Sequence, residues 1–285
     1  MALIFLVEDD ETLQNAYRLV LENRGYTVIS ALNGKDALLK YELLPKEPNR
    51  ILLDHRMPEK EGLAIAQDIL AMNPGANIIF LSADIVVEHL AVKLGARFLS
   101  KPFTLDELLS CIRNTERQPF RHFFIFVTNH EDKRAKIFPF LRHGFYRKEK
   151  CLYMTCEESI DLARKDLILH GLEEESLTSF DICSLKDWLS GSKKDPLAII
   201  KRFKQFLEEN IKSGQCLRVV IELNFSDIGV DSLLKNETNL HKVIKNTPNA
   251  RLMCAYHVEG DVSVLKESLV PKLQKIGLKT PPSLY

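Results

Sequence analysis

The sequence predicts two consecutive α/β domains, each built on a parallel β-sheet, and two observations lead to this prediction. The chain has 285 residues, which is enough for about two domains of ordinary size. Short, continuous apolar segments alternate along it with longer segments in which apolar residues recur at helical spacing. Such alternation is typical of parallel sheets that are covered by helices on both faces.

The first 118 residues contain five strand–helix units. Leu3–Val7 is a continuous apolar run, as expected for a buried strand, and the helix Thr12–Asn23 that follows stops before Gly25. The other expected strands are Thr27–Ala31, Arg50–Leu53, Asn77–Leu81 and Arg97–Leu99, and the other expected helices are Lys35–Tyr41, Leu63–Met72, Val86–Leu94 and Leu105–Thr115. Five such units in series predict a doubly wound parallel sheet.

A second α/β series is expected over residues 122–278, after a short connector at residues 119–121. Its expected strands are Phe123–Val127, Cys151–Thr155, Leu177–Ile182, Leu217–Leu223 and Arg251–Tyr256. Its expected helices are Asp132–His143, Ser159–His170, Pro196–Ile211, Ser232–Ile244 and Val262–Leu269. Pro139 should kink the first of these helices or delay its start. Residues 279–285 contain two prolines and should form a tail.

Composition excludes several classes of protein. Lys plus Arg and Asp plus Glu both number 39, so the net charge is zero, which argues against a protein that coats nucleic acid by bulk charge. No apolar run reaches the roughly 20 residues of a membrane-spanning helix. The acidic residues that follow the first strand are unlike a signal peptide, so we expect a cytoplasmic protein. None of the six cysteines forms a C-x-x-C pair, and we expect most of them to be reduced and buried.

Carboxylates directly follow two of the expected strands. Glu8 and Asp9 come after Leu3–Val7, and Asp54 comes after Arg50–Leu53. In an open parallel sheet, the carboxyl ends of neighbouring strands face a common crevice at the topological switch point. Carboxylates crowded there repel one another, and a divalent cation relieves the repulsion. Because oxygen atoms are the ligands that Mg²⁺ prefers, the sequence predicts a magnesium site.

A hydroxyl and an ammonium group are expected beside these carboxylates. Ser82 follows the fourth strand and Lys101 follows the fifth. Together with a metal-bound carboxylate, they would form a site for an anion. We therefore interpret Asp54 as a phosphorylatable aspartate. Its oxygen would attack phosphorus while the metal and Lys101 neutralise the charge on the transferring group.

Four sequence blocks together resemble the receiver domain of two-component response regulators. The blocks are Glu8-Asp9-Asp10, Asp54-His55-Arg56-Met57-Pro58 with Gly62, Ser82-Ala83 and Lys101-Pro102-Phe103. The resemblance covers residues 1–118. It implies a flavodoxin-like fold with five parallel strands and a sensor histidine kinase as the phosphodonor. It also allows a homodimer that forms through this domain.

The resemblance implies a set of Mg²⁺ ligands around the acceptor. Asp54 is the phosphoacceptor in this comparison. Asp9 and Asp54 would bind Mg²⁺ through their side chains, Glu8 through water, and Arg56 through its backbone carbonyl. Glu8 stands where the family more often has Asp, and the Arg56 side chain is a bulky cation that could affect dephosphorylation.

The resemblance also implies how the phosphoryl group is bound and read. Ser82 would form a hydrogen bond to a phosphoryl oxygen, and Lys101 would pair with the group. Phe98 occupies the aromatic switch position. Because phenylalanine has no hydroxyl group, any switch at this position would act through packing alone. Phosphorylation should shift the population of two states and repack the faces around Ile85–Gly95 and Leu105–Asn114.

The second half lacks the sequence motifs of common output domains. It contains no G-x-x-x-x-G-K-[ST] loop, no G-x-S-x-G or H-E-x-x-H motif, and no Cys/His zinc spacing. Polar residues at expected strand ends are candidates for one ligand pocket: His130, Glu222, Asn224, Tyr256 and His257. The alternative is that these side chains are scattered strand-end residues without a common role.

Residues 122–270 resemble the MEDS sensory domain of methanogens and methylotrophs, which is related to the RecA/KaiC-like α/β fold but lacks its nucleotide loop. The matching segments are His122-Phe123-Phe124-Ile125, Phe138-Pro139-Phe140-Leu141 with Gly144, Glu149-Lys150-Cys151-Leu152-Tyr153, Leu217–Leu223 and Cys254-Ala255-Tyr256-His257. The resemblance implies ligand sensing or protein interaction and supplies no catalytic residues.

We therefore expect a response regulator whose phosphorylation at Asp54 controls a RecA-like sensory or interaction domain. That second domain would bind a small molecule or a protein, with no catalysis beyond receiver phosphorylation and dephosphorylation. Two alternatives remain open at this point. One is a transcription regulator that binds DNA through the basic, aromatic-rich residues 121–150, although the net charge argues against nucleic acid. The other is a degenerate RecA-like domain that binds a nucleotide.

Overall fold

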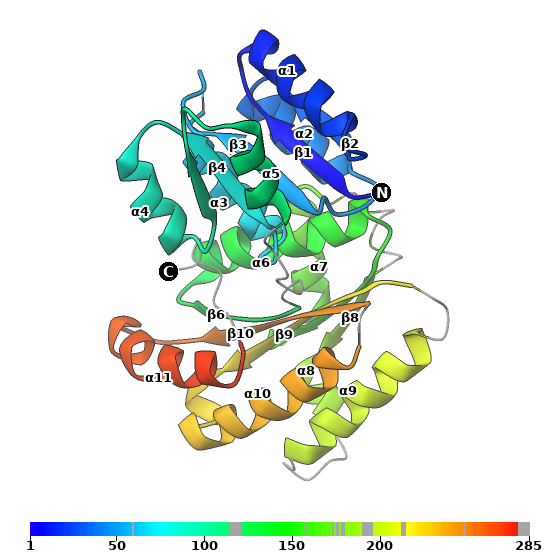
Figure 1. Ribbon diagram of the computed structural model, residues 1–285. Coiled ribbons are helices and arrows are strands. Elements are labelled where there is room, and N and C mark those ends of the chain that lie inside the picture. Colours follow the sequence, from blue (N-terminus) through cyan, green and yellow to red (C-terminus); the bar gives the residue numbers. More distant parts are fainter. Residues whose placement is uncertain are drawn as a thin grey trace. The chain divides into compact units, whose positions relative to one another are not determined.

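The computed structural model describes residues 1–58, 60–113, 121–157, 159–172, 174, 177, 180–189, 196–211, 215–247 and 249–278. The chain divides into two compact units, the first up to residue 119 and the second from residue 120 (Figure 1). Residues 119 and 120 of the expected connector and the whole expected tail lie outside the described residues. No helix in the described part of the chain is long and apolar enough to cross a membrane.

The first unit is a five-stranded parallel sheet with the strand order β2-β1-β3-β4-β5. Its strands are β1 (Leu3–Val7), β2 (Thr27–Ala31), β3 (Arg50–Asp54), β4 (Ile78–Ser82) and β5 (Arg97–Ser100). Its helices are α1 (Glu11–Glu22), α2 (Gly34–Leu43), α3 (Gly62–Met72), α4 (Ile85–Lys93) and α5 (Leu105–Arg113). Every expected element of this unit is present, and no end is shifted by more than two residues.

The first sheet is buried on both faces, which explains why its strands are continuous apolar runs. All five residues of β1 are buried. Phe5 and Val7 pack in a core with residues of α2, α3 and α4, whereas Ile4 and Leu6 pack in a second core with residues of α1 and α5. Alternate residues of one strand therefore supply both cores.

The second unit is also a five-stranded parallel sheet, with the strand order β6-β10-β9-β7-β8. Its strands are β6 (His122–Val127), β7 (Lys150–Thr155), β8 (Phe180–Ser184), β9 (Leu217–Asn224) and β10 (Ala250–His257). Its helices are α6 (His130–Tyr146), α7 (Ile160–Leu169), α8 (Leu185–Leu189), α9 (Pro196–Ile211), α10 (Val230–Lys245) and α11 (Ser263–Lys275), and a short 3₁₀ turn, η2 (Phe225–Asp227), follows β9. Helices α6 and α7 cover one face of the sheet, and α9, α10 and α11 cover the other (Figure 1).

Four elements of the second unit differ from the sequence prediction. The third strand was expected at Leu177–Ile182 and lies at Phe180–Ser184, and the short helix α8 directly after it was not expected. Pro139 does not delay the start of α6, because the Asn129 side chain caps that helix by accepting a hydrogen bond from the Asp132 backbone N–H. Helix α11 continues past the expected end at Leu269 and contains Pro271.

A buried ion-pair cluster joins β9 to the turn before β7. The Arg218 side chain is fully buried, and its Nε lies 2.7 Å from Glu149 Oε2 while its Nη1 donates to the Phe140 carbonyl at 2.7 Å. Arg251 and Arg147 pair with the other Glu149 oxygen at 3.1 and 3.2 Å. Burial by itself would raise the pKa of Glu149, but the three guanidinium groups outweigh it and hold the pKa below its ordinary value.

We predict that Arg218→Met destabilises the second unit by about 3 kcal/mol, because it removes the most buried cation from a buried carboxylate. The measurement is urea unfolding of the full chain, followed by the fluorescence of its single tryptophan, Trp188 in α8. Arg251→Gln is the matched control and should cost less, because the Arg251 side chain is 17% exposed. Equal losses in the two variants would contradict this assignment.

Candidate functional site

Three carboxylates converge at the switch point of the first sheet, between β1 and β3. Glu8 and Asp9 follow β1, and Asp54 is the last residue of β3. One oxygen from each of the three carboxylates lies within 4.8 Å of the others. Glu8 is 2% exposed and Asp54 is 6% exposed. Two largely buried carboxylates at this separation need a cation between or beside them.

The structure supplies that cation in Lys101, directly after β5. Its Nζ lies 3.0 Å from Glu8 Oε2 and 3.0 Å from Asp54 Oδ1, so one ammonium group bridges both carboxylates. Burial would lower the pKa of Lys101, but its hydrogen bonds to Glu8 and Asp54 outweigh burial and raise it. Burial raises the pKa of Glu8, although the Lys101 ammonium counteracts part of this effect. The site therefore holds one charged lysine beside three carboxylates, and a further cation there would be stabilised by their negative charge.

The remaining predicted receiver residues lie in or after β3, β4 and β5. Ser82 ends β4, the neighbour of β3, and its buried hydroxyl accepts a hydrogen bond from the Asp84 backbone N–H at 3.1 Å. The Arg56 side chain is 76% exposed and turns to Asp84, with 3.2 Å between Nη2 and Oδ2. Phe98 lies in β5, partly buried against the core that contains Phe80.

Two further residues support the site, Gln14 and Gly62, and the sequence analysis had named only Gly62, as part of the Asp54 block. Gln14 is buried in α1, and its side-chain N–H groups donate to the carbonyls of Glu8 and Ala31 at 2.9 and 2.8 Å. It fixes the turn that carries the carboxylates. A side chain on Gly62 would place a Cβ atom 2.2 Å from the Asp54 carbonyl oxygen, so only glycine fits there.

A second polar cluster lies at the switch point of the second sheet, between β9 and β7. Its centre is Glu222, which is fully buried. The Tyr153 hydroxyl donates to Glu222 Oε1 at 2.7 Å, and the Thr155 hydroxyl donates to Oε2 at 2.8 Å. Burial would raise the pKa of Glu222, but the nearby His257 imidazole, the charge of Lys133 and the hydrogen bond from Tyr153 lower it to about 2.

Lys133 of α6 is the cation of this second cluster. Its side chain is 1% exposed, its Nζ lies 3.2 Å from Glu222 Oε1, and it also pairs with Glu157. Burial would lower the pKa of Lys133, but the two carboxylates outweigh burial and raise it. Each unit thus places one lysine between two carboxylates at the switch point of its sheet, where parallel α/β folds bind ligands.

The structure does not bring the five expected pocket residues together. Glu222 and His257 meet, with 3.7 Å between Glu222 Oε1 and His257 Nε2. Tyr256 lies on the opposite face of β10, because successive residues of a strand alternate between faces, and its hydroxyl donates to Glu237. His130 lies beside Glu157 and Asp166 rather than beside Glu222, and Asn224 is exposed at the end of β9. The sequence prediction missed Lys133, Tyr153, Thr155 and Glu157, which complete the cluster.

Comparisons with known families agree with this two-part architecture. Residues 4–113 match the response regulator receiver domain. Residues 121–267 match MEDS, the methanogen/methylotroph, DcmR sensory domain. The second match covers just over half of the chain and extends from β6 into α11.

Individual relatives match the receiver region. The transcriptional regulatory protein CrdR of Helicobacter pylori is 42% identical over 118 residues, which is 39% of this chain and 53% of CrdR. The chemotaxis protein CheY of Listeria monocytogenes is 30% identical over 123 residues, which is 41% of this chain and 100% of CheY. A solved receiver-domain structure from Clostridium thermocellum is 27% identical, with a TM-score of 0.39, and the match covers 40% of this chain and 93% of that one.

These matches differ in how much of each relative they include. The chain spans about half the length of the transcriptional regulators CssR, from Bacillus subtilis, and CrdR. The whole length of CheY, in contrast, is covered by the receiver region. By its two family matches, the chain belongs to the response regulators, with a receiver domain followed by a MEDS domain.

Proposed function

We propose that Asp54 accepts a phosphoryl group from a sensor histidine kinase in a Mg²⁺-dependent reaction. The observation that supports this proposal is the Lys101 ammonium, 3.0 Å from both Asp54 and Glu8, beside three converging carboxylates. The carboxylate oxygens fit the ligand preference of Mg²⁺. The second domain would receive the resulting change and act as a sensory or interaction module.

The chemistry uses groups that the fold already holds in place. Asp54 Oδ attacks phosphorus, an acyl phosphate bond forms, and the bond from phosphorus to the donor nitrogen breaks. Mg²⁺ held by Glu8, Asp9, Asp54 and the Arg56 carbonyl would neutralise charge on the phosphoryl oxygens. Lys101 Nζ and the Ser82 hydroxyl bind the same oxygens. Water attack on phosphorus later restores Asp54 and releases phosphate.

The contacts around Asp84 provide a route from the acceptor to α4. Phosphorylation adds about −1.5 to −2 charges at Asp54. The Ser82 hydroxyl accepts from the Asp84 backbone N–H, so its movement toward the phosphoryl group disturbs that contact. The Asp84 side chain caps α4 by accepting from the Val86 N–H at 3.0 Å and also pairs with Arg56. Repacking of α4 and Phe98 would then present a different face to a partner or to a second copy of this domain.

The second domain is better suited to binding a small molecule or a protein than to binding DNA. Five basic side chains of the region 121–150 pair with carboxylates of their own domain, which compensates their charge locally. These pairs are Lys133–Glu157, Arg134–Asp166, Lys136–Asp132, Arg147–Glu149 and Lys150–Asp181. The cluster around Glu222 and Lys133 marks the switch point of the second sheet, the place where parallel α/β folds bind small ligands.

We predict that Asp54→Asn abolishes Mg²⁺-dependent uptake of acid-labile phosphate from a small phosphodonor, because the amide cannot act as the nucleophile. The measurement is incorporation of labelled phosphate, with acid and base stability of the product as the test of an acyl phosphate. Asp68→Asn on the exposed side of α3 serves as the control and should leave uptake unchanged. Uptake by the Asp54→Asn chain at the wild-type rate would show that another residue is the acceptor.

We predict that Lys101→Met slows phosphate uptake by about 10²-fold, the usual effect of removing one group that stabilises developing charge. The reason is that Lys101 is the cation shared by Glu8 and Asp54. Lys93→Met, at the exposed end of α4, is the matched control and should react at the wild-type rate. Single-exponential uptake at saturating Mg²⁺ gives both rates. If the two variants were equally fast, Lys101 would have no role in the transfer step.

A further inference from the structure

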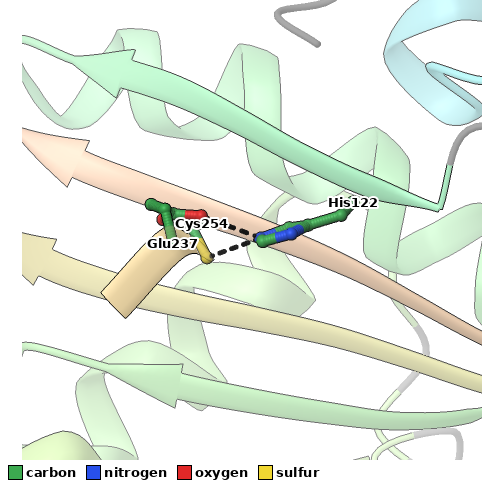
Figure 2. A group of neighbouring side chains, drawn as sticks. All are labelled: His122, Glu237 and Cys254. Carbon is green, nitrogen blue, oxygen red and sulfur yellow. Dashed lines mark hydrogen bonds and ion pairs between the residues drawn. The ribbon is translucent and has the colours of Figure 1, made fainter. Parts of the chain in front are cut away.

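A third cluster of chemically reactive side chains lies inside the second domain, apart from the cluster around Glu222. His122 is the first residue of β6, Cys254 lies in the neighbouring strand β10, and Glu237 lies in α10. Figure 2 shows the three side chains pointing toward one another. His122 Nε2 lies 2.9 Å from Glu237 Oε2 and 3.5 Å from Cys254 Sγ. The three ligand-type atoms all lie within 4.8 Å of one another.

This cluster lies in the buried interior of the second domain. His122 is 2% exposed, and Glu237 and Cys254 are 0% exposed. Within the described part of the chain, no lysine or arginine forms an ion pair with Glu237. Glu237 Oε2 makes no hydrogen bond, although it lies 2.9 Å from the imidazole nitrogen. A buried carboxylate oxygen that faces a nitrogen and a sulfur without a hydrogen bond is costly unless a cation binds there.

We propose that His122, Glu237 and Cys254 bind a zinc ion. Imidazole nitrogen, carboxylate oxygen and thiolate sulfur are the three side-chain donors that Zn²⁺ uses in proteins. One zinc ion, one carboxylate, one thiolate and one neutral imidazole sum to zero charge, so binding would neutralise the buried site. Ligand atoms around a tetrahedral zinc lie about 3.5 Å apart. The observed separations of 2.9 and 3.5 Å need only small adjustment.

Neighbouring side chains hold two of these ligands in position. The Tyr256 hydroxyl donates to Glu237 Oε1, which leaves Oε2 directed toward His122 and Cys254. The His241 ring stacks on the His122 ring, with 5.7 Å between centroids and 19° between planes. Supporting contacts of this kind orient the ligands of protein metal sites. Three protein ligands leave a fourth coordination position for water or a small ligand.

Two other metal-type groups among the described residues differ in ways that matter for zinc. Cys156, Glu222 and His257 also lie within 4.8 Å of one another, but the Lys133 ammonium 3.2 Å from Glu222 already supplies positive charge and would repel a second cation. Glu8, Asp9 and Asp54 offer oxygen alone, which suits Mg²⁺ better than zinc. The cluster of His122, Glu237 and Cys254 is thus the better match to zinc.

The test uses Co²⁺ as a spectroscopic substitute for zinc in the full-length chain, refolded with Co²⁺ so that a buried site can fill, and with excess Mg²⁺ to occupy the receiver carboxylates. We expect one equivalent of Co²⁺ and a near-ultraviolet thiolate-to-cobalt charge-transfer band, which zinc removes. Cys254→Ser should lose the band. Cys151→Ser in β7 and Cys156→Ser just after it are the matched controls and should retain it, with far-ultraviolet circular dichroism as the check on folding.

Tyr256→Phe tests the supporting contact without removing a ligand. It should retain the charge-transfer band and bind Co²⁺ about 10- to 100-fold more weakly, the usual effect of losing a group that orients a metal ligand. If the Cys254→Ser chain does not fold, His122→Gln takes its place, and a loss of one equivalent of metal supports the site. The proposal is wrong if the wild-type chain shows no charge-transfer band, or if Cys156→Ser loses the band and Cys254→Ser keeps it.

Discussion

Burial of both faces of a parallel sheet is the constraint on which the rest of this chain depends. Because helices cover each face, strand interiors such as Leu3–Val7 are apolar throughout, and charged groups collect where the strands end. At the switch point of each sheet, the crossover helices diverge and leave space between two strands. The fold therefore concentrates its carboxylates there, and each set of carboxylates requires a nearby cation.

Both domains meet this requirement in the same way. Lys101 joins Glu8 to Asp54 in the receiver domain, and Lys133 joins Glu222 to Glu157 in the MEDS domain. The two clusters differ in how completely their carboxylates are bonded. Glu222 accepts from two hydroxyls and a lysine, and its pKa is held at about 2, whereas burial raises the pKa of Glu8. The receiver carboxylates thus remain suited to a metal ion and a phosphoryl group, and those of the MEDS domain are satisfied by protein groups.

The two faces of the MEDS sheet carry separate polar chemistry. Glu222 and His257 face the side covered by α6 and α7, whereas Cys254 and Tyr256 face the side covered by α9, α10 and α11. Strand β10 therefore contributes to both clusters with neighbouring residues. A movement of this strand would therefore shift side chains on both faces of the sheet, because the interior is closely packed.

The sequence by itself determined the two-domain organisation, nearly every strand and helix, and the receiver residues that meet at the switch point. Each of those inferences rests on local periodicity or on the rule that parallel strands end at one edge. Alternation along β10 would also have separated Tyr256 from His257, although our expected pocket combined them. Only the tertiary structure decided that Gln14 supports the receiver turn, that Lys133 pairs with Glu222, and that His122 meets Cys254, 132 residues away. The physical reason is that these contacts depend on how helices pack on the sheets and on which strands pair, and no spacing within one segment records either.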